Sequence, residues 1–147
     1  MQDGKKYAKY FIEDFADPKR ETLPGGPESA GGTNVLMINN EAGGVVPNAT
    51  YMNAEIVTKP TKPGPFQQHA HGFDEYIQVL GTNMDDPYRL DGLVEFWMED
   101  EKYLLTRSCA IFVPKGVYHG PFVFHRVDSP IAWIESAGVT HYSYGMY

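Results

Sequence analysis

The segment that decides the fold is His69-Ala70-His71-Gly72-Phe73-Asp74-Glu75, where a glutamate follows two histidines that are one residue apart. Because side chains alternate between the two faces of a strand, His69 and His71 point the same way, with their backbones about 6.5 to 7 Å apart. Glu75 has the same parity, and its longer side chain reaches the same point if the strand twists or turns near Gly72. One stretch of chain is therefore predicted to supply three ligands to a metal ion.

A second segment, Pro114-Lys115-Gly116-Val117-Tyr118-His119, supplies another imidazole. The fixed φ of Pro114 and the conformational freedom of Gly116 allow a sharp turn, so we expect His119 to project inward from a different strand. Three imidazoles and a carboxylate suit Fe, Mn, Ni, Zn or Co better than Ca or Mg, which prefer oxygen. Four protein ligands leave about two octahedral positions for water or substrate. The predicted ligands of one divalent transition-metal ion are His69, His71, Glu75 and His119.

The chain as a whole has the pattern of an all-β protein. Its 15 glycines and 11 prolines interrupt the sequence too often for long helices. Short runs of β-branched and aromatic residues alternate with turn residues, without crossover helices, so a jelly roll fits better than a parallel sheet. Residues 81–92 are expected to form a longer polar connection. Strands are predicted at 34–39, 50–59, 67–80, 94–99, 102–106, 110–113, 117–125 and 131–136.

The first 33 residues are predicted to form a strand and a loop. Residues 7–14 fit a first strand or a short helix, and the β-rich remainder favours the strand. Residues 17–33 contain so many prolines and glycines that they cannot pair in a ladder, which indicates a surface loop. With 147 residues, the chain is expected to form one domain, in which this N-terminal part (1–33) precedes a barrel at 34–147.

Composition restricts the partners and the compartment. The formal net charge of −7 argues against a nucleic acid or an anionic membrane, because both attract basic surfaces. The apolar runs are too short to cross a bilayer, and the polar start of the chain does not resemble a secretory signal. The single cysteine, Cys109, fits a reducing compartment and is expected to be a buried, unreactive thiol. A cytoplasmic protein is the expectation.

The two ligand segments resemble the two motifs of the cupin superfamily. Residues 64–81 are similar to the first motif, with a glycine, HxH, a glutamate and a closing glycine, and residues 108–122 are similar to the second, with PxGxxH. Gly64 and Gly81 each lie one residue nearer the ligands than usual, Ser108 stands in place of a glycine, and Val123 in place of an asparagine. The resemblance implies a divergent single-domain cupin-type jelly-roll β-barrel, or double-stranded β-helix, that keeps all four ligands.

Several functions are compatible with this resemblance. It implies a metal-dependent enzyme that acts on a small oxygenated molecule, such as a dioxygenase, an isomerase or a decarboxylase. The alternative is a non-catalytic protein that binds a sugar or a carboxylate at its metal. A metal-free isomerase with histidines as acid and base is a third hypothesis, which a complete ligand set makes unnecessary. The resemblance also implies a homodimer, for which the strand at 7–13 is our candidate contact.

Other residues have weaker assignments. His125 shares the parity of His119 and is a weak catalytic candidate, although a surface role is favoured. Tyr76 and Tyr118 neighbour ligands and so are expected to face away from the site, and His141 is given no chemistry. Arg89 and Arg126 are the cations nearest the motifs and could hold a substrate carboxylate. The aromatic residues expected to fill the interior are Phe66, Phe96, Trp97, Phe112, Phe122, Phe124 and Trp133.

Overall fold

A computed structural model describes residues 4–12, 15–16, 32–38, 46, 48–62 and 68–142 of the chain. Within these residues the chain forms a short 3-10 helix, Ala8–Tyr10, and nine strands. The strands are β1 Phe15–Ala16, β2 Gly32–Ile38, β3 Met52–Val57, β4 Glu75–Gly81, β5 Arg89–Met98, β6 Glu101–Arg107, β7 Cys109–Val113, β8 His119–Val127 and β9 Ile131–Ala137.

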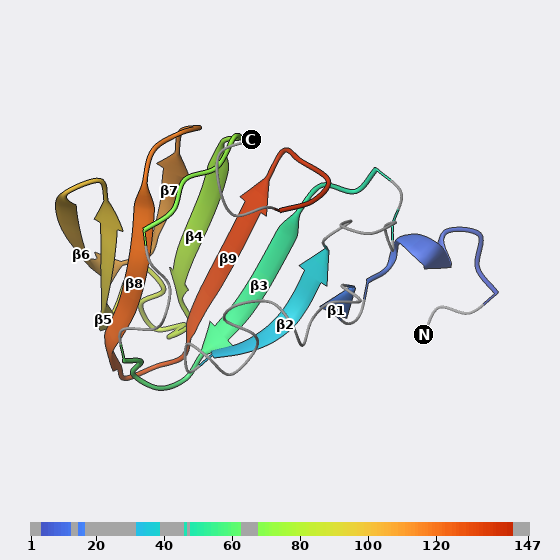
Figure 1. Cartoon of the computed structure of the whole chain (residues 1–147). Coiled ribbons are helices and arrows are strands. Elements are labelled where there is room, and N and C mark those ends of the chain that lie inside the picture. The colour runs from blue at the N-terminus through green and yellow to red at the C-terminus, as the bar shows by residue number, and fades with distance from the viewer. Residues whose placement is uncertain are drawn as a thin grey trace.

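The strands form two sheets. The larger has six strands in the order β1-β2-β3-β9-β4-β7, and the smaller has three in the order β6-β5-β8. All neighbouring strands are antiparallel except β1 and β2. Figure 1 shows the smaller sheet at the left, beside the β4–β7 end of the larger sheet, while β2 and β1 extend away from it to the right. The predicted all-β jelly-roll architecture is confirmed.

The core lies between the two sheets. Trp133 of β9 and Phe96 of β5 face each other with ring centroids 6.4 Å apart, and both are almost completely buried. Phe122 of β8 stacks on Trp133 at 4.1 Å. Alternate residues of β5, from Leu90 to Phe96, are buried in the same way, as expected for a strand with one face on the core. The apolar interior therefore consists mainly of aromatic and β-branched side chains.

Two of the aromatic residues predicted for the interior lie elsewhere. Phe112 is 47% exposed and packs against Tyr76 on the outer side of β4 and β7, with ring centroids 5.1 Å apart. Trp97 has the opposite parity to Phe96, and its indole lies beside the ammonium group of Lys102. Phe66 lies outside the described residues. The prediction was wrong for Phe112 and Trp97 because it counted aromatic residues without their parity.

The N-terminal prediction also needs correction. Residues 8–10, expected in a strand, form a 3-10 helix whose amides bond within its own turn, with Phe11 N donating to Ala8 O at 3.0 Å. Gly32 and Thr33, assigned to the loop, begin β2, and the earlier part of that loop lies outside the described residues. Strand β5 begins at Arg89, so the connection expected over 81–92 is shorter and spans 82–88.

A close backbone contact explains the glycine that ends β4. A Cβ atom on Gly81 would lie 1.9 Å from the carbonyl oxygen of Arg89, so only glycine allows the chain to return this tightly into β5. Ser108 holds the same corner: its hydroxyl accepts a hydrogen bond from Gly81 N at 2.8 Å and donates to Pro87 O at 2.6 Å. The serine that departs from the cupin motif thus fastens the 82–88 connection to the end of β4.

Candidate metal centre

Two segments far apart in sequence are joined by backbone hydrogen bonds at the site. His69 and His119 form an antiparallel bridge, in which His69 N donates to His119 O at 3.0 Å and His119 N donates to His69 O at 2.9 Å. Gly116 N donates to the carbonyl of His71 at 2.9 Å. His69 and His71 precede β4, which begins at Glu75, so they lie in an extended segment and not in the predicted long strand 67–80. These hydrogen bonds thus fix the backbone positions of the three histidines relative to one another.

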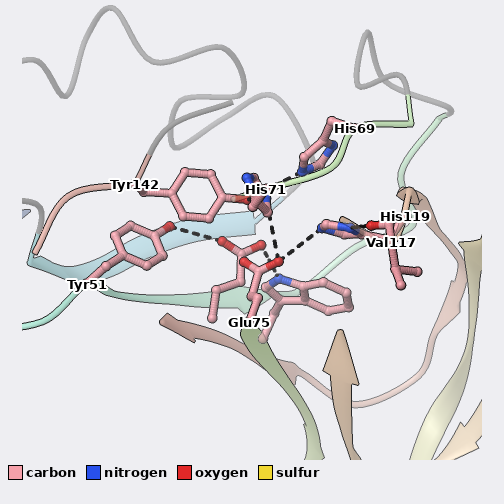
Figure 2. Close-up of polar contacts among 9 residues, drawn as sticks. Tyr51, His69, His71, Glu75, Val117, His119 and Tyr142 are labelled. Carbon is pink, nitrogen blue, oxygen red and sulfur yellow. Dashed lines mark hydrogen bonds and ion pairs between the residues drawn. The ribbon is translucent and has the colours of Figure 1, made fainter. Parts of the chain in front are cut away.

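The three imidazoles converge on one point (Figure 2). One ligand nitrogen from each of His69, His71 and His119 lies within 4.8 Å of the others. Their ring centroids are 4.5 to 5.1 Å apart. His71 and His119 are each 2% exposed and lie inside the protein, while His69 is partly buried. The three histidines therefore form a potential metal site.

Glu75 adds a carboxylate to the cluster from the first position of β4. Its Oε2 lies 3.0 Å from His119 Nε2 and 3.7 Å from His71 Nε2, and the residue is 1% exposed. Among the described residues, neither oxygen of Glu75 has a hydrogen-bonding partner, and the short approach to His119 Nε2 lacks hydrogen-bond geometry. Buried polar atoms without partners destabilise a fold, so these atoms fit a site that a cation completes.

The tautomer of His119 also suits a metal ion. Nδ1 of His119 lies 3.0 Å from the carbonyl oxygen of Val117, which can only accept, so Nδ1 carries the proton and Nε2 is directed toward Glu75. Burial lowers the pKa of His119, but the Glu75 carboxylate and the Val117 carbonyl outweigh it and raise this pKa above its usual value. A cation bound at Nε2 would take the place of the second proton that this raised pKa favours, while Nδ1 keeps its own.

Tyr142 is a residue of the site that sequence reasoning missed. Its hydroxyl lies 2.7 Å from His71 Nε2 and 3.4 Å from His69 Nε2, and Figure 2 shows its ring directed at His71. The sequence places it in an aromatic tail next to His141, with no spacing that links it to either motif. Only the packing of the segment after β9 brings it to the histidines.

A second group of carboxyl groups lies on the inner face of β3 and β9. Glu135 accepts hydrogen bonds from Tyr51 Oη at 3.1 Å and Trp133 Nε1 at 2.8 Å, and burial, together with the charge of Glu75, raises its pKa. Burial, and then the charge of Glu135, raises the pKa of Glu55 to about 8. The sequence signal for both residues is a glutamate at an inward-facing strand position, which was not used in the prediction.

The weak catalytic candidate His125 does not join the site. Its Nε2 lies 2.9 Å from Glu95 Oε2, and its side chain is 44% exposed. The parity argument was wrong because β8 contains extra residues relative to β5. Phe124 pairs with Val94 and Arg126 with Leu93, which leaves His125 between two consecutive partners. The bond from His125 lowers the pKa of Glu95, as expected for an exposed pair.

The remaining residues named from the sequence lie away from the histidines. Arg89 pairs with Asp91 at 3.3 Å and Arg126 with Asp128 at 3.0 Å, and the arginine side chains are 62% and 60% exposed, so neither forms a clamp in the interior. Cys109 is half-buried, and burial raises its thiol pKa, which disfavours a reactive thiolate.

The predicted outward orientation of the two tyrosines that neighbour ligands is confirmed. Tyr76 is 50% and Tyr118 is 47% exposed. His141 is exposed.

Comparisons with solved structures identify the fold. No family model matches the sequence, and no curated protein is similar to it. A recombinant oxalate oxidase in complex with glycolate is 13% identical, with a TM-score of 0.54 over 99% of this chain and 66% of that chain. An oxalate oxidase in complex with the substrate analogue glycolate is 14% identical, with a TM-score of 0.53 over 97% and 65%. A cupin-like protein from Thermotoga maritima is 14% identical, with a TM-score of 0.47 over 74% and 68%.

At these identities the likeness shows the fold alone. The chain spans about two thirds of the length of the two oxalate oxidase chains. In the described part of the chain, no helix is both long and apolar enough to cross a bilayer. The predicted jelly-roll architecture is confirmed: this chain has the fold of the two oxalate oxidase structures, as the cupin-like motifs of its two ligand segments led us to expect.

Proposed function

We propose that the chain binds one divalent transition-metal ion through His69, His71, Glu75 and His119. The observation that carries this proposal is the buried Glu75 carboxylate, which has no hydrogen-bonding partner among the described residues and lies against two of the three converging imidazoles. Three nitrogen ligands and one oxygen ligand favour Fe, Mn, Ni, Zn or Co. The negative charge of Glu75 offsets part of the charge of the ion in an apolar interior.

The function that fits this centre best is that of a metal-dependent enzyme acting on a small oxygenated molecule. A bound ion would supply Lewis acidity or, as Fe(II), a place for O2. The protein itself orients the ligands, since the Val117 carbonyl fixes the tautomer of His119. Glu55, with a pKa of about 8, keeps a proton at neutral pH and gives the interior an acid group. The same centre without turnover would describe a binding protein.

The two oxalate oxidase structures suggest which compounds to test on this chain. The two oxalate oxidase structures hold glycolate, a two-carbon hydroxy acid, and they share the fold of this chain. The reaction proposed here is broader than oxalate oxidation, because low identity carries no substrate from one chain to the other. It covers oxygenases, isomerases and decarboxylases that place substrate oxygen atoms beside the metal.

Metal analysis of the purified protein tests the centre. We expect about one transition-metal ion per chain in the wild type and loss of that ion in His119→Ala. His125→Ala is the matched control, because it removes an exposed imidazole that is bonded to Glu95 and not to the cluster. Unchanged metal in His119→Ala, or equal loss in both folded variants, would contradict the ligand assignment.

Turnover distinguishes the enzyme from the binding protein. Metal-replete protein is incubated with a panel of hydroxy acids, enediols and sugars, with oxygen uptake and product formation as readouts. We expect conversion of at least one compound, abolished by His119→Ala. Retention of a compound without conversion would favour the binding function instead.

A further inference from the structure

Tyr142 is held near the histidines by the segment that leaves β9. Ala137 N donates to the carbonyl of Tyr51 at 3.2 Å, and Tyr51 N donates to the carbonyl of Val139 at 2.6 Å. These two hydrogen bonds attach the chain after β9 to the start of β3. The backbone that leads to Tyr142 is therefore fastened at both sides of Gly138.

The ring of Tyr142 is also held in place by packing. It lies 4.5 Å from the Tyr51 ring and 5.7 Å from the Phe73 ring, measured between centroids. The three side chains belong to a second apolar cluster that also contains Met37 and Ala137. This packing directs the hydroxyl group toward the imidazoles, as Figure 2 shows.

The hydroxyl of Tyr142 contacts a nitrogen that is also a proposed ligand of the metal. His71 Nε2 is the nitrogen that lies 3.7 Å from Glu75 Oε2, and it is also the nitrogen that lies 2.7 Å from Tyr142 Oη. A nitrogen that binds a cation cannot also accept a hydrogen bond, so the phenol loses this bond when the site is filled.

The distances suit a position beside the imidazoles in one coordination sphere. Bonds of about 2.1 Å place two ligand atoms at right angles about 3 Å apart. Tyr142 Oη lies 2.7 Å from His71 Nε2 and 3.4 Å from His69 Nε2, on either side of that value. Tyr51, a buried phenol in the same cluster, donates to Glu135, so it does not compete for the place.

We propose that Tyr142 is a fifth protein ligand of the metal, bound through its phenolate oxygen. This inference rests on the proposed metal centre and deepens it. Four ligands would leave about two octahedral positions open, whereas five leave about one. A substrate would then bind through a single oxygen atom and not as a chelate of two, unless Tyr142 is displaced.

Spectroscopy of the ferric protein tests this ligand. The protein is loaded with Fe(II), oxidised in air to Fe(III) and examined by visible absorption and resonance Raman spectroscopy, with iron content measured for each sample. We expect a phenolate-to-iron charge-transfer band with enhanced tyrosine ring modes in the wild type. Tyr142→Phe is expected to lose the band and keep at least half of its iron, and Tyr51→Phe is the matched control that keeps both.

The outcomes separate the two proposals. Stoichiometric iron without a phenolate band in the wild type would overturn the tyrosine ligand and leave the metal centre intact. A band that persists in Tyr142→Phe, or vanishes only in Tyr51→Phe, would also overturn it. Absence of bound iron in the folded wild type would refute the metal centre itself. The Raman result on the wild type does not depend on how well any variant folds.

Discussion

Glu55 is a buried residue whose ionisation is expected to couple the stability of the protein to pH. It is 8% exposed on the inner face of β3, and its pKa is raised from 4.5 to about 8, first by burial and then by the charge of Glu135. Between pH 4.5 and about 8, Glu55 therefore keeps its proton in the folded protein and loses it in the unfolded chain. Stability is greatest below about pH 4.5 as far as this group is concerned, and it falls as the pH rises toward 8.

The variant Glu55→Gln is expected to remove this pH dependence. Each pH unit of the window corresponds to about 1.4 kcal/mol, which sets an upper limit of about 5 kcal/mol for the whole window. Urea unfolding of chelated protein at several values between pH 5.5 and 8 should show a shallower loss of stability in Glu55→Gln than in the wild type. Glu101→Gln, at an exposed strand position, should follow the wild type.

If the free energy of unfolding fell with pH equally steeply in the wild type and in Glu55→Gln, the Glu55 carboxyl would already be charged at neutral pH. Glu135 also has a raised pKa and contributes a slope of its own, so the difference between the two proteins is the quantity that tests Glu55.

At this scale the sequence predicted the residues with local spacing and missed those without it. The sequence predicted that His69, His71, Glu75 and His119 converge, because parity and a Pro-Gly turn bring such residues together whatever the rest of the fold does. Tyr142 and Glu135 could not be found in this way. Tyr142 depends on how the segment after β9 packs against Tyr51, and Glu135 is marked only by sharing the parity of the buried residues of β9, with no spacing that links it to either motif.

Among the elements, the corner between β4 and β5 has the most restrictive geometry. Gly81→Ala is expected to destabilise the protein by about 1 to 3 kcal/mol, because the new Cβ would meet the backbone oxygen of Arg89 at 1.9 Å. The midpoint of urea unfolding measures this loss. Gly138→Ala is the matched control, since a Cβ there meets no atom within 4 Å, and equal effects of the two substitutions would contradict the steric explanation.

Strands were easier to predict than their boundaries and their pairing. The predicted ranges 50–59 and 131–136 contain or nearly match β3 and β9, because β-branched residues between turn residues mark them locally. The 3-10 helix at Ala8–Tyr10 and the late start of β4 at Glu75 were missed. Whether each of these segments forms a strand depends on the presence of a neighbouring strand. Ahead of β4, His69 pairs through an isolated bridge to His119.

For the whole molecule, the proposed metal would join the two sheets. Glu75 begins β4 in the six-stranded sheet, and His119 begins β8 in the three-stranded sheet. At a free metal concentration 100 times Kd, binding to the folded state alone stabilises it by about 2.7 kcal/mol. For a chain of this size we expect chelation to lower Tm by about 5 to 10 °C.

A thermal melt with and without a chelator measures this effect. Re-addition of the metal should restore Tm in the wild type and leave His119→Ala unchanged. If re-added metal raised the Tm of His119→Ala as much as that of the wild type, the stabilising ion would have to bind elsewhere.

The overall architecture was predictable because strand number, turn spacing and two short motifs agree with one another. The arrangement of the acidic interior was not, since it depends on the register between β3, β9 and β4, where Asn53 lies opposite Glu135, and Glu135 opposite Ile77. Register follows from long-range pairing, which a single sequence does not contain.

The two irregularities in β8 make this strand intolerant of changes in length. Between His119 and Phe122, and again at His125, β8 carries one residue more than β5 opposite it. Removing one residue between His119 and Phe122 would turn the following side chains to the opposite face and carry Phe124 from the core to solvent. Removing one at His125 would in the same way turn Val127 away from the core. Gene variants with single-codon deletions should therefore be absent from β8 in a selection for folded protein, yet survive in the hairpin between β5 and β6.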